Sequence, residues 1–405
     1  MWNGSGGDGH LHKQSMALRF INIAVFSDRT FFYHQKWYLL PATSCIFAAQ
    51  REKHFKSEMN VSCDMRCDSP GFTAKFGTYT TIDTDTQKVI HVEVVQKDEC
   101  PNSPAMELEG LKRTLSVLQG YGVTIKRLVS DRHSSIAAFL KSTTIIHYFD
   151  AWHIAKGIKK KCIKASNNKE CDKIGKWIPS IIRMVYWIGN TTQETEDLDA
   201  DGELRKQKFQ SIYNHIRGIH NHETTLYPKC LHGELEPRDY IQPNSKAEEV
   251  VSNILNSPYL LRSIKQLSPT IQTYSNESFH QIINHFAPKM HHFRFKGMLA
   301  RTYLAALHCN ENVGRPQRVN KKGDTEHSLW YSRAKKDWMA KKHLVDPTFV
   351  YAINTIEMAM YMAKTNTKGS YYTAEMMCDP GTITEKLPKP DKTDFVAKLI
   401  SRFKH

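Results

Sequence analysis

Between residues 75 and 150 the chain alternates strand-like and helix-like runs, and this order restricts the fold more than any other feature of the sequence. Residues 75–82 and 88–95 are predicted to be strands, and the turn-forming residues 83–86 between them predict a hairpin. In the second run Ile90, Val92 and Val94 share one face, which is the period of two expected of a strand. A further strand edge is predicted at residues 61–64, just before the hairpin.

The next runs change to helical spacing and back again. Leu108, Leu111, Leu115 and Leu118 recur on one helical face, and Gly120 follows as a stop signal. Residues 124–130 and 143–149 are predicted strands, a short helix is expected at 134–141, and a basic helix follows residue 150. The resulting order β-β-β-α-β-α-β-α predicts an α/β fold with a mixed sheet.

The bulk properties restrict the class of protein and its partners. The 405 residues can form one large or two to three average domains. A net charge of +15 favours a polyanionic partner, nucleic acid first. The nine scattered cysteines do not resemble a secreted disulfide framework and indicate a reducing compartment. Since no apolar run approaches about 18 residues, we expect no membrane span.

Three carboxylates occupy positions from which they can converge. Asp64 and Asp131 follow short apolar runs, and Glu277 lies on the polar face of a helix predicted at residues 268–288. Carboxylates at adjacent strand ends can hold a pair of Mg²⁺ (or Mn²⁺) ions, which stabilise the attacking and leaving oxygens of a phosphodiester. The pattern therefore predicts a two-metal phosphoryl-transfer site with Asp64, Asp131 and Glu277 as ligands.

Each of these carboxylates has a simpler interpretation. Glu277 is also compatible with a solvated position on an amphipathic helix, and an Asp after a strand often caps the next helix. Asp68 is the alternative first carboxylate, although it precedes Ser69, Pro70 and Gly71 and so suits a turn.

A second pair, Asp150 and His153, begins the basic helix. The spacing of three places both residues on one side of the helix start. His153 could then orient or protonate a leaving group, and the alternative is a buried histidine with satisfied hydrogen bonds.

Several separate blocks, in order over about residues 30–340, resemble Kolobok-type DDE DNA transposases. The first block is Cys63 to Thr80, and the second comprises Ser130 to His133 and Phe149 to Lys156. The C-terminal block comprises Phe286 to Lys289, Gly297 to Arg301 and Ala305 to Asn312. The family's first block usually reads Asp-Gly-Arg, whereas Met65 replaces the glycine here, and a methionine next to Asp64 is expected to crowd a metal.

The resemblance implies a ribonuclease H-like catalytic domain with a mostly α-helical insertion before the Glu277 helix. It implies metal-dependent DNA strand cleavage and transfer at Asp64, Asp131 and Glu277, with Asp150 and His153 as the family's Asp-x-x-His signature. Such transposases often carry an N-terminal THAP-type zinc domain, which Cys45, the one cysteine of residues 1–60, cannot form. The expected parts are a disordered start (1–15), a helical segment (16–60), the core (61–164), the insertion (165–265), the catalytic helix with core completion (266–312) and a basic C-terminal region (313–405).

The resemblance also implies a nuclear protein that acts on DNA, transposon ends and target, as a homo-oligomer. Two alternatives stay open. One is a degenerate or domesticated derivative that binds DNA without cutting it, and the other is a metal-dependent nuclease without strand transfer.

Two further clusters are candidate binding sites. Nitrogen and sulfur ligands for Zn²⁺ crowd one short segment, although spacings of one residue are uncommon in structural zinc sites and surface histidines are the alternative; they are His215, His220, His222, Cys230 and His232. Lysines on the basic helix suit contacts with DNA phosphates, although charge runs are usually solvated faces; they are Lys156, Lys159, Lys160, Lys161 and Lys164.

Overall fold

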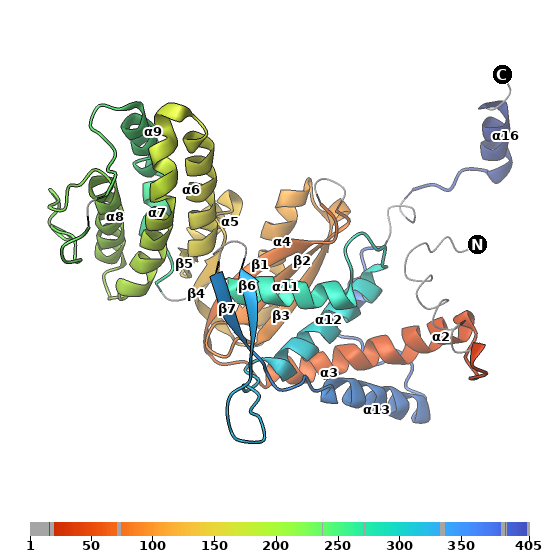
Figure 1. Ribbon diagram of the computed structural model, residues 1–405. Helices are drawn as coiled ribbons and strands as arrows, with labels where there is room; N and C mark the ends of the chain where they lie inside the picture. Colours follow the sequence, from red (N-terminus) through yellow and green to blue (C-terminus); the bar gives the residue numbers. More distant parts are fainter. Residues whose placement is uncertain are drawn as a thin grey trace.

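A mixed five-stranded sheet forms the centre of the computed structural model (Figure 1). The structure describes residues 16, 20–70, 74–236, 238–269, 273–332, 337–381, 385 and 387–402. The strands lie in the order β3-β2-β1-β4-β5 and are β1 (Glu58–Cys67), β2 (Phe76–Asp83), β3 (Val89–Gln96), β4 (Thr124–Ser130) and β5 (Ile146–Phe149). The first three are antiparallel neighbours, and β4 and β5 run parallel to β1. The predicted α/β class with a mixed sheet is confirmed.

Helices cover both faces of the sheet because the side chains of each strand alternate between two cores. On one face Val61, Cys63 and Tyr79 belong to a core with α4 (Ser103–Gly120) and α5 (Ser134–Leu140). On the other face Phe76, Val92 and Val94 pack with α3 (Leu40–Glu52), α11 (Tyr274–Phe286) and α12 (Phe295–Asn312). Even-numbered residues of β1 therefore face α11.

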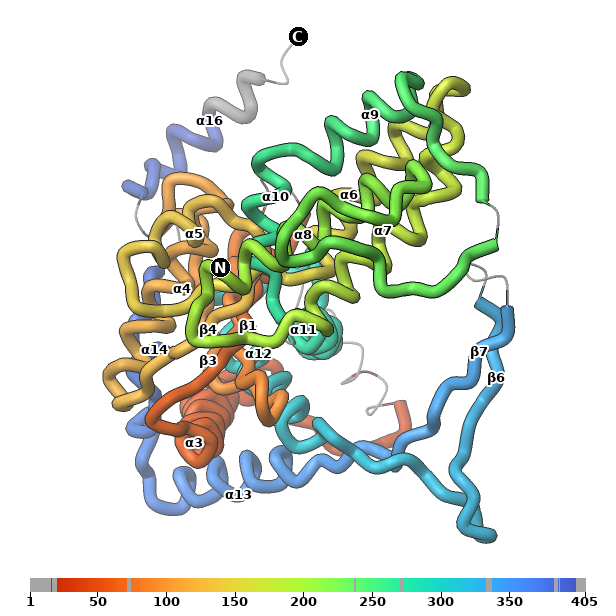
Figure 2. Tube along the Cα trace, turned by 90° about the vertical axis from the view of Figure 1, so that its left-hand side faces the viewer, coloured from red at the N-terminus to blue at the C-terminus, as the bar shows by residue number. Residues whose placement is uncertain are grey.

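A helical lobe leaves the sheet after β5 and returns beside it (Figures 1 and 2). It comprises α6 (Ala151–Ser166), α7 (Asp172–Thr191), α8 (Leu198–His215), α9 (Lys246–Leu255) and α10 (Pro258–Lys265), which share one apolar core. The returning chain pairs with the end of β5: the Phe149 amide donates to Gln266 O at 2.7 Å and the Ser268 amide to Phe149 O at 2.9 Å. The residues expected to form a helical insertion, 165–265, are thus mostly helical, and α6 belongs to the same core.

Parts of both terminal regions pack against α3. The helical segment expected at the N-terminal side contains α2 (Asp28–His34), a π-helical turn (Gln35–Leu39) and α3. Beyond α12 the chain forms a hairpin of β6 (His327–Ser332) and β7 (Asp337–Lys342), then α13 (Val350–Lys364), α14 (Ala374–Met377) and α16 (Lys392–Arg402). Buried Arg51 of α3 pairs with Glu375 of α14 at 2.8 Å, which fixes the C-terminal segment to the core.

The structure corrects one predicted strand and leaves one expectation outside its described part. Residues 143–145 do not belong to β5, because the Thr143 amide donates to Leu140 O at 3.0 Å and closes the end of α5. The disordered start expected at 1–15 lies outside the described residues. All nine cysteines are free thiols. Among the described residues, no helix has both the length and the apolar content needed to cross a bilayer.

Candidate active site

The register of the parallel strands lines up three aspartates at one edge of the sheet. Ser62 on β1 pairs with Val129 on β4, so Asp64 and Asp131, each two residues further on, come side by side. Ser130 pairs with Phe149 on β5, which brings Asp150 next to Asp131. The carboxylates thus lie in the order in which the strands β1, β4 and β5 lie in the sheet.

Helix α11 brings the fourth carboxylate, Glu277, because Asn276 fixes this helix to two strands. Asn276 is fully buried, and its Oδ1 accepts a hydrogen bond from Ser62 Oγ at 2.7 Å. Its Nδ2 lies 3.3 Å from the carbonyl oxygens of Ser62 and Thr80. Asn276 thus satisfies polar groups of β1 and β2 and places the next residue, Glu277, over the sheet edge.

The electrostatics of Asp64 show that these carboxylates converge. The pKa of Asp64 is raised to about 7, mainly by burial and also by the negative charges of Asp131, Glu277 and Asp150, while a hydrogen bond from the Met65 amide opposes this rise. Like charges raise a carboxyl pKa only when they are near and are not neutralised by cations. The negative charge around Asp64 therefore exceeds the positive charge.

A fifth carboxylate, Glu107 of α4, faces the same cluster and was not predicted. Burial, followed by the charges of Asp131 and Asp64, raises the pKa of Glu107 to about 9. Glu107 precedes Leu111 by one helical turn and so extends the buried face that the leucine spacing predicted. A carboxylate in line with an apolar stripe was the signal that could have identified it.

His280 supports Asp64 from the other side, one turn after Glu277 on α11. Its Nδ1 lies 3.5 Å from Asp64 Oδ2, and its Nε2 lies 3.1 Å from Thr80 Oγ1. Burial, with smaller effects from Arg66 and Lys289, lowers the pKa of His280 to about 3. The low pKa favours a neutral ring at pH 7, so the contact of His280 with Asp64 is not an ion pair.

Asp150 connects α6 with the start of α11. Its fully buried carboxylate caps α6 by accepting from the His153 amide at 3.1 Å, and it also accepts from the Thr273 amide at 3.1 Å. Since Thr273 lies one turn before Glu277, Asp150 positions the Glu277 helix. The capping interpretation of Asp150 is correct, and the same carboxylate also contributes charge to the cluster. The His153 ring packs against Trp152, with centroids 4.7 Å apart.

Asp64, rather than its alternative Asp68, lies beside Asp131. The Asp68 carboxylate accepts a hydrogen bond from the Lys75 amide at 2.9 Å. The Asp68 carbonyl oxygen accepts from the Met290 amide at 3.0 Å. The first bond closes the connection between β1 and β2, which is the turn role weighed for Asp68, and the second joins this connection to the segment between α11 and α12.

Met65 does not crowd the carboxylates, because neighbouring residues of a strand point to opposite faces. Its sulfur occupies the space over Gly77, where an added Cβ would lie only 2.7 Å from Met65 Sδ. Its methyl group lies toward Gly110 of α4. The two glycines thus make room for the methionine on the face away from α11, and the expected crowding of a metal is wrong.

The lysines predicted to contact DNA line the outer side of α6. Lys156, Lys159, Lys160, Lys161 and Lys164 are all exposed, while the opposite side of the helix is buried in the lobe. Because α6 begins at Asp150, this basic surface starts at the acidic cluster. Lys156 Nζ lies 4.2 Å from the centre of the Trp152 ring.

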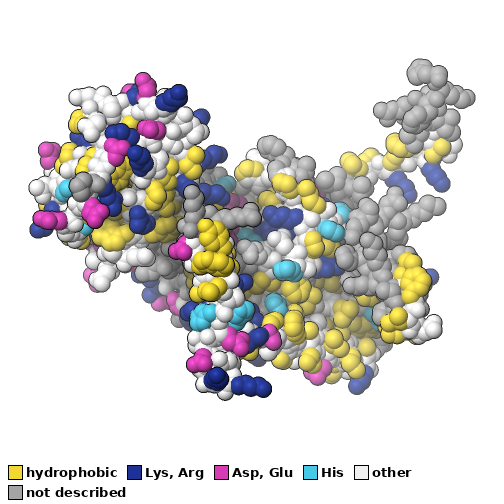
Figure 3. All heavy atoms as spheres, viewed as in Figure 1, with side chains coloured by type: hydrophobic (Ala, Val, Ile, Leu, Met, Phe, Trp, Pro, Cys, Tyr) yellow, Lys and Arg dark blue, Asp and Glu magenta, His cyan; other side chains and the backbone are white. Residues whose placement is uncertain are grey.

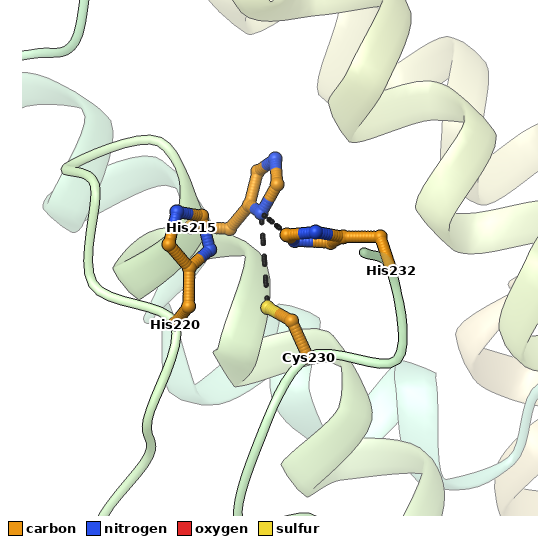
Figure 4. A group of neighbouring side chains, drawn as sticks. All are labelled: His215, His220, Cys230 and His232. Atoms are coloured by element: carbon orange, nitrogen blue, oxygen red, sulfur yellow. Dashed lines mark hydrogen bonds between the residues drawn. The ribbon is translucent and has the colours of Figure 1, made fainter. Parts of the chain in front are cut away.

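Four of the five predicted zinc ligands come together in the lobe, far along the chain from the carboxylates. The ligand atoms of His215, His220, Cys230 and His232 all lie within 4.8 Å of one another (Figure 4). His222 is not part of this group of four, although its Nε2 lies 3.3 Å from Cys230 Sγ.

The donor set at the sheet edge suits hard divalent cations. Asp64, Asp131, Glu277 and Glu107 offer carboxylate oxygens, the ligands that Mg²⁺ and Mn²⁺ prefer. The raised pKa values of Asp64 and Glu107 indicate mutual repulsion that a cation would relieve. No protein family, curated protein or solved structure matches the chain, so these assignments depend on its own geometry.

Proposed function

We propose that this protein is a DDE transposase-like enzyme with a ribonuclease H-like core that cleaves and joins DNA strands. The observation that supports the proposal most strongly is the convergence of Asp64, Asp131 and Glu277. Strand register aligns the two aspartates, and the buried Asn276 sets the glutamate beside them. The sheet order β3-β2-β1-β4-β5, with three antiparallel strands followed by two parallel ones, is compatible with a ribonuclease H-like fold.

Asp64, Asp131 and Glu277 would hold the cations, and Glu107 lies close enough to share their charge. Bound Mg²⁺ or Mn²⁺ would supply charge stabilisation for the attacking and leaving oxygens of a phosphodiester. Neutral His280 holds the Asp64 carboxyl group in place, and Asp150 fixes the start of α11. These residues keep the ligand set in position before DNA arrives, which is the condition for precise two-metal chemistry.

The basic outer side of α6 would bind the DNA backbone. The first of its five lysines, Lys156, follows Asp150 by less than two turns, so a strand lying along α6 would place a phosphate near the acidic cluster. Lysines contact phosphates without reading sequence, and this binding would weaken as the salt concentration rises. His153, in the first turn of α6, would protonate the leaving oxygen in this proposal.

The test is an assay of DNA products in Mn²⁺ with supercoiled plasmid and short duplex DNA. Nicked plasmid together with covalently joined duplex is the expected result. Nicks without joined strands would indicate a metal-dependent nuclease. DNA binding with neither product, in a sample shown to bind Mn²⁺, would contradict the proposed activity and favour a DNA-binding derivative of a transposase.

A further inference from the structure

The second metal-ligand cluster lies at the end of α8 and in the long connection that follows it. His215 is the last residue of α8, and the other three side chains come from residues 216–245, which precede α9. Figure 4 shows the three rings and the thiol turned toward a common centre. His215 Nδ1 lies 3.2 Å from His232 Nε2 and 3.7 Å from Cys230 Sγ.

These two separations match edges of a tetrahedral zinc site. With Zn–N bonds of about 2.05 Å and a Zn–S bond of about 2.3 Å, neighbouring ligands of a tetrahedron lie about 3.3 Å apart for two nitrogens and about 3.6 Å for nitrogen and sulfur. We propose that His215, His220, Cys230 and His232 bind one structural Zn²⁺ ion. Four protein ligands fill the tetrahedron and leave no position for a substrate.

Hydrogen bonding alone does not explain how the four side chains meet. A ring nitrogen offers one proton or one lone pair in the plane of the ring, so His215 Nδ1 cannot make two well-directed bonds at once. The Nδ1 atom of His220 is buried and has no hydrogen-bond partner in the part of the chain that the structure describes. Since a buried nitrogen without a partner is unfavourable, a cation among these rings would satisfy an otherwise unpaired group.

The connection between α8 and α9 has little regular secondary structure to hold it in place. Among its described residues it has no helix or multi-residue strand, only the single bridge between Asn221 and Lys229. Connections longer than about 12–15 residues without secondary structure are uncommon in compact folds. Hydrogen bonds at 2.9 Å from the Cys230 amide to His220 O and at 2.7 Å from the His222 amide to Pro228 O already bring the ligands together.

The conformation of the connection is also fixed where it leaves α8. Gly218 has a φ of +80°, and an added Cβ would lie 3.4 Å from the Tyr240 ring. The turn at Gly218 sends the chain back past His215, whose ring packs edge-on against Trp177 at 5.8 Å. Trp177 in turn stacks on Tyr240 at 5.8 Å, so the ends of the connection are held by aromatic contacts and its middle by the four ligands.

The experiment measures zinc in the full chain purified without chelators. We expect about one Zn²⁺ per chain in the wild type and at least a tenfold loss in Cys230→Ser and His220→Ala. His222→Gln removes the nearby histidine that the geometry leaves out, and Cys378→Ser removes an exposed thiol elsewhere. Both controls should keep the ion. Equal zinc contents in wild type and ligand variants, or none in any, would overturn the proposal.

Cobalt substitution gives a second readout that does not depend on the variants folding. Co²⁺ added to the zinc-free wild type should produce a thiolate-to-cobalt absorption band and tetrahedral d–d bands. The carboxylate cluster contains no sulfur ligand, so it cannot produce the thiolate band. A folded wild type that binds Co²⁺ without this band, or binds no Co²⁺, would also overturn the assignment.

Discussion

The acidic cluster and the His/Cys cluster are built in different ways, although each gathers side chains that repel one another. The acidic cluster depends on regular structure: strand register aligns Asp64 with Asp131, and a buried amide places Glu277. The His/Cys cluster depends on an irregular connection whose single bridge lies between Asn221 and Lys229 in the described residues. One is held by the fold before any cation binds, whereas the other would be completed by its cation.

The two clusters also differ in chemistry. Burial, followed by nearby carboxylates, raises the pKa of Asp64 and Glu107, while burial, followed by nearby histidines, lowers the pKa of His215. Both shifts favour the neutral form, as expected where like charges meet. Oxygen ligands select Mg²⁺ or Mn²⁺, and nitrogen and sulfur ligands select Zn²⁺. Loss of one ion should therefore leave the other site intact.

The largest effect is expected for Asp131→Asn. This change removes a central carboxylate but keeps the side-chain volume, so we expect Mn²⁺-dependent DNA nicking to fall by at least about 10³-fold. The matched control is Asp68→Asn, which lies in the turn after β1. Nicking is measured on supercoiled plasmid, and zinc content should be unchanged in both variants. Equal losses in the two variants would mean that Asp131 has no special role.

The second-largest effect is expected when zinc is removed, and it should be confined to the His/Cys cluster. Chelation is expected to lower the free energy of unfolding by about 3 kcal/mol if free zinc was about a hundredfold above its dissociation constant. Proteolysis should then cut within residues 216–245 first, since that connection would lose its crosslink. Mass spectrometry identifies the cuts. Cleavage that begins elsewhere, with 216–245 intact, would show that the ion does not order this segment.

Asn276→Ala tests how the acidic cluster is held. The change leaves Ser62 Oγ without its buried acceptor and should cost about 2 kcal/mol in urea unfolding. It should also weaken Mn²⁺ binding, because α11 would no longer fix Glu277 on the sheet. Ser278→Ala, on the exposed side of the same helix, is the control and should change neither quantity. Loss of stability with unchanged Mn²⁺ affinity would show that Asn276 does not position the metal ligands.

The smallest effect is a pH-dependent stabilisation by Glu107→Gln. In the folded protein the pKa of Glu107 is raised from its ordinary value of 4.5 to about 9. Between these two pH values Glu107 is ionised in the unfolded chain but protonated in the folded one, so the free energy of unfolding falls as the pH rises from 4.5 to 9. Without divalent ions, the variant should gain at least about 1 kcal/mol at pH 8 and nothing below pH 4.5. Thermal unfolding across pH, with the exposed Glu357→Gln as control, measures it. A gain that is the same at every pH would contradict this origin.

Much of the acidic site could be predicted because it depends on local patterns. Leucine spacing located α4 and the period of two located β3, although Ile90 belongs to a different core from Val92 and Val94. Asp131 follows the end of β4 as predicted, whereas β1 continues to Cys67, so Asp64 lies within its strand. Glu107 was missed because its contact with the aspartates arises from helix packing, which a helical period alone does not specify. Met65 was misjudged because the room made by Gly77 and Gly110 comes from two other elements.

Other parts could not be derived from sequence for related reasons. Residues 313–405 were predicted only to be a basic region. The charge pattern did not indicate the β6–β7 hairpin or helix α13, which packs against α3. That hairpin exposes Leu329, Trp330, Tyr331 and Trp338, and Figure 3 shows hydrophobic side chains gathered over it. For the histidines, sequence showed that five ligands are close in the chain. Only the path of the connection shows which four converge.

The most direct test of the proposed metal-dependent enzyme is a calorimetric titration of Mn²⁺ into the zinc-loaded full chain, comparing wild type with Asp131→Asn. The proposed site predicts binding in the wild type that strengthens as pH rises through 7, where Asp64 loses its proton, and that disappears in the variant while zinc is retained. No binding by the folded wild type with DNA present, or equal binding by both proteins, would contradict a cation site at the edge of the sheet.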